Sequence, residues 1–209
     1  MKVFDFLFGQ YSDYSVVHIV FEAIAIIASV ISVLYSKKNN ILVFPYGIIS
    51  TGIFVYLLNE WNLVGDMIIN IYYFIMSIYG WYIWTRKDQN TIVTPISQTV
   101  KREWMRSTGL FLISGVFVYF IYWKYDRFEN WVSYIDILTT SIAFVGMYLM
   151  ALRKIEYWLV LLVANVISVP LYFYKGYGLT ALLFIFLSII AWLGYQQWKK
   201  YLNKEPLTV

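Results

Sequence analysis

The chain has 209 residues, of which 61% are hydrophobic and only 13% are charged. Since soluble proteins average about 25% charged residues, this chain has too little polar surface for a compact body in water. It contains no cysteine, which excludes disulfides and thiolate chemistry, and its single histidine, His18, cannot build a histidine metal cluster. The net charge of +4 comes from basic residues scattered between apolar segments, unlike a nucleic-acid-binding face. The composition favours a membrane protein and predicts no metal, cofactor or nucleic-acid partner.

Seven apolar stretches approach the roughly 17 to 25 residues that a bilayer-spanning helix requires. A soluble helical bundle would need a polar residue every three or four positions, and the third and seventh stretches lack that pattern. The first ten residues have no small-residue cleavage site, so they are not expected to be a secretory signal. We therefore predict an all-α integral membrane protein with seven transmembrane helices. The predicted spans are 14–35, 41–58, 67–84, 107–123, 134–152, 158–174 and 179–198.

The loops on the two sides of the predicted membrane differ in Lys and Arg. The side that carries the C-terminus has 12 of these residues, and the side of the N-terminus has 4, namely Lys2, Lys124, Arg127 and Lys175. Cytoplasmic loops carry the excess of Lys and Arg in multi-pass proteins. The N-terminus is therefore predicted outside and the C-terminus in the cytoplasm.

The two halves of the chain resemble each other. Ser36-Lys37-Lys38 aligns with Leu152-Arg153-Lys154 at a separation of 116, and Gly80 to Trp84 aligns with Gly194 to Trp198 at a separation of 114. Three spans followed by one connecting span give two parallel repeats, a SWEET-like pseudo-symmetry about an axis along the membrane normal. The predicted units are a first three-helix repeat (1–84), a cytoplasmic linker (85–106), a connector helix (107–123) and a second repeat (124–209).

Polar side chains inside the predicted spans mark candidate binding positions, because such groups are costly in lipid. Asp136, Thr139 and Thr140 fall on one face of a helix, although both threonines could instead bond their own backbone. Glu22 corresponds roughly to Asp136 in the repeat, although a structural pairing with His18 competes with a binding role. The predicted substrate-binding set is Trp158, Asn165, Asn70, Asp136, Thr139, Thr140, Glu22, Tyr73 and Tyr172.

Acids beside aromatic faces form a suitable box for a flat, positively charged ring. Amides and hydroxyls would then bind sugar hydroxyls or a carboxamide. The sequence lacks a phosphate-binding loop for ATP-driven pumping, so facilitated diffusion is the simplest expected mechanism. Pro45 and Pro170 are expected inside two spans, where their missing N–H groups would make them candidate gating hinges.

Several motifs resemble the PnuC family of vitamin transporters over nearly the whole chain. They are Pro45-Tyr46-Gly47-Ile48-Ile49, Tyr79-Gly80-Trp81-Tyr82-x-Trp84, Glu156-x-Trp158, Pro170-Leu171-Tyr172-x-x-Lys175 and Gly194-Tyr195-x-x-Trp198.

This resemblance implies a three-plus-one-plus-three helix arrangement, a homotrimer in the lipid of the bacterial inner membrane, and uptake of nicotinamide riboside. It also implies that cytoplasmic phosphorylation, within NAD biosynthesis, traps the substrate. The family's Glu-x-Trp motif falls on Glu156 and Trp158, and the family's polar position two turns later is Asn165. The family's second tryptophan, one turn after Trp158, is replaced by Leu161.

The loss of that aromatic plane keeps thiamine open as an alternative substrate, because thiamine also presents a cationic ring. A membrane-bound enzyme is the alternative from a different class. That class would need a nucleophile with a base, and His18 has no evident serine partner at helical spacing.

Overall fold

The protein is described by a computed structural model covering residues 14–61, 63–88, 91–92, 94–126, 128 and 130–204. The described chain contains seven helices that are long and apolar enough to cross a membrane, which confirms the predicted all-helical membrane architecture. The helices are α2 (Val16–Lys37), α3 (Val43–Glu60), α4 (Val64–Thr85), α5 (Lys101–Lys124), α6 (Trp131–Ala151), α7 (Tyr157–Tyr174) and α8 (Gly178–Lys204), and a short hairpin of β1 (Lys87–Asp88) and β2 (Thr91–Ile92) follows α4.

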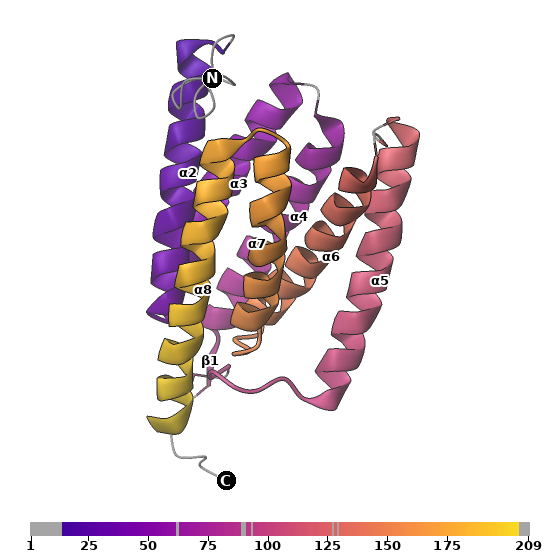
Figure 1. Cartoon of the computed structure of the whole chain (residues 1–209). Coiled ribbons are helices and arrows are strands. Elements are labelled where there is room, and N and C mark those ends of the chain that lie inside the picture. Colours follow the sequence, from indigo (N-terminus) through magenta and orange to yellow (C-terminus); the bar gives the residue numbers. More distant parts are fainter. Residues whose placement is uncertain are drawn as a thin grey trace.

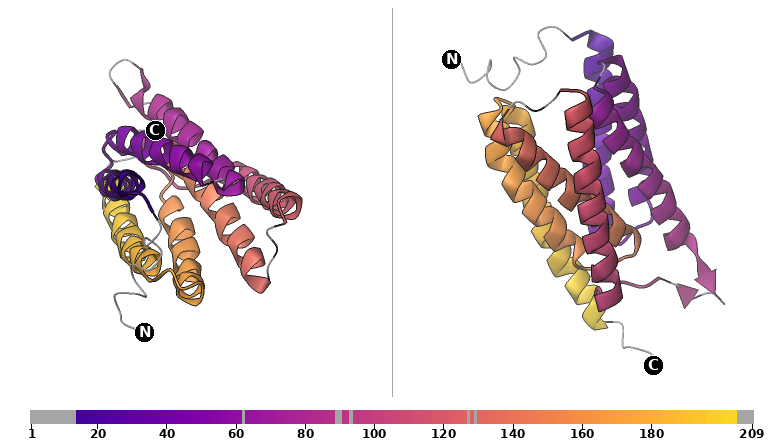
Figure 2. Two further views of the ribbon diagram at one scale, coloured as in Figure 1. Left: turned by 90° about the horizontal axis from the view of Figure 1, so that it is seen from above. Right: turned by 90° about the vertical axis from the view of Figure 1, so that its right-hand side faces the viewer.

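Six of the helices form a closed ring. Contacts run from α2 to α3, from α3 to α4, from α4 to α6, and on through α7 and α8 back to α2. Helix α5 stands outside the ring and packs mainly on α6, as the view from above shows (Figures 1 and 2). The ring places α4 against α6 and α8 against α2, so two contacts join the first three helices to the last three.

Helix α5 begins at Lys101, earlier than the predicted start at Ser107. The backbone N–H of Val100 donates to the Glu103 carboxylate at 2.9 Å, which satisfies one of the free donors at the helix start. Charged residues fill this first turn, so it does not belong to the uncharged apolar stretch that follows, although its side chains are good helix formers. The linker is therefore shorter than predicted and ends at Val100.

The helix ends of the two halves match at a separation of 114 residues. Helices α2 and α6 end at Lys37 and Ala151, and the next residue but one in each case, Asn39 or Arg153, has a left-handed backbone with φ of 52° or 53°. Helices α3 and α7 begin and end 114 residues apart, and α4 and α8 begin 114 apart. The separation of 116 that the sequence comparison uses for its first part is therefore not the one that the helix ends follow.

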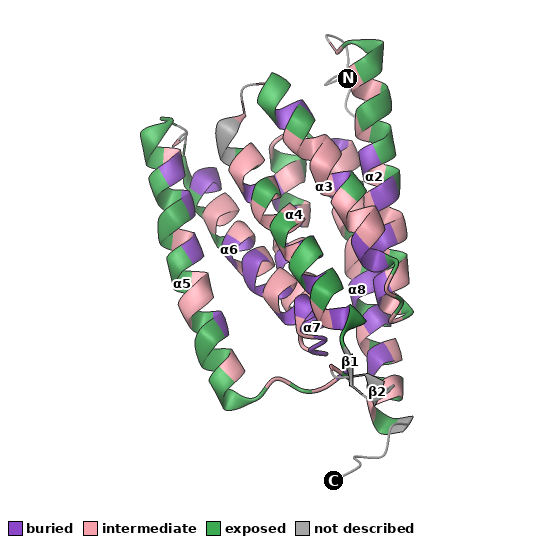
Figure 3. Ribbon diagram, turned by 180° about the vertical axis from the view of Figure 1, so that it is seen from behind, coloured by how far each residue is buried: buried purple, intermediate pink, exposed green. Residues whose placement is uncertain are grey.

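Apolar side chains cover much of the outer surface of the bundle. Ile113, Val116 and Trp123 on α5 are 70%, 72% and 65% exposed, and exposed residues follow the outer side of several helices (Figure 3). A water-soluble protein would not leave this much apolar surface in contact with solvent. The pattern fits a bundle whose outer face contacts lipid.

Candidate functional site

Three helices bring polar and aromatic side chains together at the end of the bundle where α6 begins and α7 ends. Asp136 lies in the second turn of α6, and Lys175 is the residue directly after α7. The Lys175 ammonium lies 2.6 Å from Oδ2 of Asp136 and 5.1 Å from the centre of the Tyr172 ring. The predicted acid and the predicted tyrosine are therefore brought together through Lys175, which the sequence suggested only as a loop charge and as part of a family motif.

An aromatic cluster continues this site toward the middle of the bundle, where α4 meets α6. The Tyr72 ring stacks on Phe144 with centres 3.8 Å apart, and the Tyr72 hydroxyl donates to the Phe144 carbonyl at 3.0 Å. Tyr73, a predicted site residue, lies edge-on to Phe144 at 5.8 Å. These contacts join the first three helices to the last three.

Two of the predicted polar residues bond their own helices. The Thr139 hydroxyl donates to the carbonyls of Ile135 and Asp136, at 3.0 and 3.1 Å. The Asn70 amide donates to the Asp66 carbonyl at 3.0 Å. The alternative reading of Thr139 as a backbone-bonded residue is therefore the one that the structure shows.

The remaining predicted polar residues lie on three different helices. Thr140 follows Thr139 on α6, and Asn165 lies half-buried halfway along α7. Glu22 on α2 lies near Tyr14, where burial and then the Glu22 carboxylate raise the pKa of the tyrosine. The ring of His18, the structural partner considered for Glu22, lies edge-on to Trp61 at 6.1 Å.

Trp158 is fully buried at the other end of α7, among aromatic side chains. Its ring lies 4.3 Å from Tyr157 and 5.9 Å from Trp198, measured between centres, and packs flat on the bare backbone of Gly194. Its indole N–H is buried and has no hydrogen-bond partner within the described chain. The indole thus fills the core at this end of the bundle, so Trp158→Ala is expected to destabilise the fold as well as to remove a predicted site residue.

The first half of the chain repeats this packing. Phe44 takes the place of Trp158, because its ring packs on Gly80 and lies edge-on to Trp84 at 5.0 Å. The Gly-x-x-x-Trp endings that align in the sequence therefore have a packing explanation: the glycine admits a ring from the neighbouring helix, and the tryptophan covers it.

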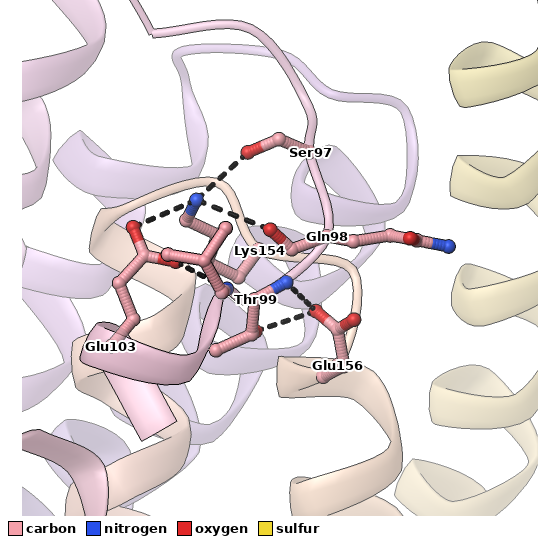
Figure 4. A network of polar contacts seen from close by, with 7 residues as sticks. Ser97, Gln98, Thr99, Glu103, Lys154 and Glu156 are labelled. Carbon is pink, nitrogen blue, oxygen red and sulfur yellow. Dashed lines mark hydrogen bonds and ion pairs between the residues drawn. The ribbon is translucent and has the colours of Figure 1, made fainter. Parts of the chain in front are cut away.

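Glu156, the other residue of the Glu-x-Trp motif, fastens the linker to the turn between α6 and α7 (Figure 4). Its Oε2 accepts hydrogen bonds from the backbone N–H of Thr99 at 2.9 Å and from the Thr99 hydroxyl at 2.6 Å. Ser97 adds two backbone bonds, donating to the Arg153 carbonyl and accepting from the Ile155 N–H. The acid of the motif therefore holds a chain segment in this structure.

Two buried basic residues complete the attachment of the linker. Lys154 forms an ion pair with Glu103 at 2.8 Å and donates to the Ser97 hydroxyl at 3.0 Å (Figure 4). Arg153 donates to the Thr94 carbonyl at 2.9 Å, and its guanidinium lies 4.0 Å from the centre of the Trp84 ring. In the sequence both residues are recognisable only as loop charges, and their partners are known only from the folded structure.

We expect Glu156→Ala to release the linker, because the carboxylate supplies both hydrogen bonds to Thr99. Trypsin should then cut between Thr85 and Lys101 about ten times faster, since an opening free energy lower by about 1.5 kcal/mol raises the open population by that factor. Glu60→Ala, which removes an exposed acid at the end of α3, is the control. Equal cleavage of Glu156→Ala and the wild type would show that this carboxylate does not hold the linker.

The two prolines occupy different positions. Pro170 lies inside α7, as predicted. Pro45 lies in the first turn of α3, where helix N–H groups lack intrahelical acceptors, and the Ile41 carbonyl four residues before it accepts from the Phe44 N–H at 3.2 Å. The interior position expected for Pro45 is therefore wrong, and Pro170 alone keeps the interior position that a hinge was expected to have.

A cavity of about 330 Å³ lies between α5, α6 and α7, away from these residues. Its walls are almost wholly apolar, and none of the predicted site residues lines it. The lining residues are Trp104, Ser107, Thr108, Phe111, Ile142, Val145, Val160 and Val163.

Comparisons with known proteins identify relatives over nearly the whole chain. Residues 19–200 match the family described as nicotinamide mononucleotide transporter. The nicotinamide riboside transporter PnuC of Escherichia coli is 25% identical over 206 residues, covering 85% of this chain and 84% of that protein. The PnuC of Neisseria mucosa is 24% identical, covering 88% of this chain and 73% of that protein.

A solved structure has the same fold. The crystal structure described as the vitamin B3 transporter PnuC superposes with a TM-score of 0.66 at 19% sequence identity, covering 95% of this chain and 86% of that one. The family match over residues 19–200 and the curated relatives place the chain among transporters and not among membrane-bound enzymes. The chain belongs to the nicotinamide mononucleotide transporter family, the family of PnuC transporters.

Proposed function

We propose that the protein carries nicotinamide riboside across the bacterial inner membrane by facilitated diffusion, and that cytoplasmic phosphorylation within NAD biosynthesis traps the substrate. The family match over residues 19–200 is the observation that carries this proposal, together with the two relatives that are named as nicotinamide riboside transporters. No cofactor is required, because the substrate moves down its own gradient.

The chemistry of the α4–α6–α7 site supports a cationic ring as the substrate. Asp136 supplies a carboxylate, and Tyr73 and Tyr172 supply aromatic faces, which together attract the positive charge of a pyridinium ring. Asn165 lies halfway along α7, where its amide would bind the sugar hydroxyls or the carboxamide. Trp158, Asn70, Thr139, Thr140 and Glu22 remain proposed contributors that would have to reach the ligand in another conformation.

The unphosphorylated nucleoside is favoured over nicotinamide mononucleotide by the charges at this site. A phosphate would require a cation with no other partner, and Lys175, the cation found here, is already paired with Asp136 at 2.6 Å. Asp136 and Asp66 both act electrostatically on Tyr122 at this end, and their negative charges would repel a phosphate.

We further propose two parallel repeats, α2–α4 and α6–α8, related by an axis along the membrane normal, with α5 as the connector. Matching helix ends at a separation of 114 residues and the paired Phe44–Gly80 and Trp158–Gly194 contacts support this arrangement. Alternating access would then rock one triplet against the other, with Pro170 as a hinge in α7. The excess of basic residues supports a cytoplasmic C-terminus, and resemblance to the family suggests a homotrimer.

A thermal-shift panel of the purified protein tests the substrate. A ligand that binds only the folded protein raises its melting temperature. A ligand concentration of 100 times Kd raises the free energy of unfolding by about 2.7 kcal/mol. We expect nicotinamide riboside to raise the melting temperature, and thiamine, riboflavin and nicotinamide mononucleotide to leave it unchanged. A shift with thiamine alone would establish the alternative substrate, which the leucine at position 161 keeps open. No shift with any of the four would contradict vitamin transport.

A further inference from the structure

The Lys175 ammonium lies at a position that resembles a binding site for an organic cation. One side of the charge faces a carboxylate oxygen at 2.6 Å, and another faces the Tyr172 ring, whose centre is 5.1 Å away. A carboxylate with an aromatic face is the combination that proteins use to bind a positively charged ligand group. The chain's own cation therefore occupies a site whose chemistry suits a cationic ligand.

Acidic and phenolic groups from neighbouring helices keep this position negative. The charges of Asp136 on α6 and Asp66 on α4 both act on the Tyr122 hydroxyl of α5. The Lys175 and Asp136 side chains are only 23% and 15% exposed, so water screens these charges weakly. Such a position attracts whichever cation reaches it.

Lys175 is attached in a way that allows it to leave. It follows the last residue of α7, and the next residue, Gly176, has a φ of +82°, which begins the turn into α8. Asp136 is fixed within a helix, whereas lysine has a flexible four-carbon chain and a strongly hydrated head group. The lysine can swing toward water while the carboxylate and the tyrosine stay in place.

We propose that Lys175 is an internal competitor for the substrate's positive charge, and that a cationic ring must displace it from Asp136 and Tyr172 in order to bind. This inference rests on the proposed function and adds a specificity-determining residue to it. A neutral ring of the same shape gains nothing at the carboxylate, so it leaves the Lys175–Asp136 pair in place and binds more weakly beside it. Selection for charge thus comes from competition as well as attraction.

Two substitutions at position 175 should act in opposite directions. Lys175→Met removes the competitor and should lower the Kd of nicotinamide riboside about fivefold. Lys175→Arg replaces it with a planar group that can bond both carboxylate oxygens and stack on the tyrosine, and should raise the Kd about fivefold. If the Lys175–Asp136 pair were purely structural, Lys175→Arg would impair nicotinamide riboside binding less than Lys175→Met.

The experiment is a titration of the purified, full-length protein with nicotinamide riboside and with its dihydro form, which has the same sugar and carboxamide but a neutral ring. The Kd of the dihydro form should differ little between the two variants. Lys124→Met, which removes an exposed lysine at the same end of the bundle, controls for a general change in charge and should change neither Kd. Melting curves establish that each variant is folded, and Lys175→Arg keeps the test decisive if Lys175→Met does not fold.

The proposal is overturned if Lys175→Arg binds nicotinamide riboside as tightly as the wild type, or if the variants change the two ligands by the same factor. Binding by the wild type together with either of these results would leave the transport proposal in place and remove only the role of Lys175. A wild type that binds neither ligand would instead contradict the proposed function itself.

Discussion

Gly194→Ala is expected to destabilise the protein by about 1–3 kcal/mol, because an added methyl group would lie 2.5 Å from the Trp158 ring. The indole is fully buried between Tyr157, Trp198 and the α8 backbone, so it has no space into which it can retreat. The melting temperature in detergent should fall by about 5 °C.

Gly109→Ala is the matched control for this substitution. Gly109 lies within α5 and has no atom near the position of an added methyl group. Alanine is the better helix former, so this variant should be as stable as the wild type or more stable. In the Gly194→Ala background, Trp158→Leu should lower the free energy of unfolding by less than it does alone, because the smaller side chain relieves the clash with the added methyl group. Independent, additive effects of the two changes would show that these residues do not press on each other.

Asn165→Ala is expected to weaken nicotinamide riboside binding about 10- to 100-fold while the protein stays folded. The loss corresponds to one or two hydrogen bonds from an amide to a polar ligand in a site with little water. Asn165 is half-buried halfway along α7, so its truncation should cost little packing. Substrate binding to the purified variant measures the effect directly.

Ser188→Ala on α8 controls for the loss of a polar group within the bundle. The Ser188 hydroxyl donates to the Phe184 carbonyl of its own helix at 2.8 Å, so its removal should not change ligand affinity. Asn165→Ala binding with the affinity of the wild type would remove Asn165 from the proposed site. Equal losses of affinity in both variants would instead indicate that removing any polar group inside the bundle weakens binding, so that Asn165 has no specific role.

Local contacts explain why several site residues could not be assigned from the sequence. A threonine three residues after Asp136 could either line a binding face or bond its own backbone. The side-chain rotamer decides between the two, and in the structure the Thr139 hydroxyl donates to the carbonyls of Ile135 and Asp136. Pro45 lies in an apolar stretch, but the helix begins only two residues before it, at Val43. The position of a helix start depends on the turn before it, which apolarity does not reveal.

The amino-acid sequence by itself determined the membrane environment, the seven helices and the similarity of the two halves. Lipid imposes a minimum length of apolar chain on every span. A run of consecutive apolar residues meets this requirement, so each span can be recognised in the sequence. The tertiary structure decided the partners of the charged residues. Lys175 meets Asp136, and Glu156 holds Thr99, because folding joins positions 39 and 57 residues apart. Such pairings depend on which helices are neighbours and on which side chains they turn toward each other, and neither property follows from the spacing of residues along the chain.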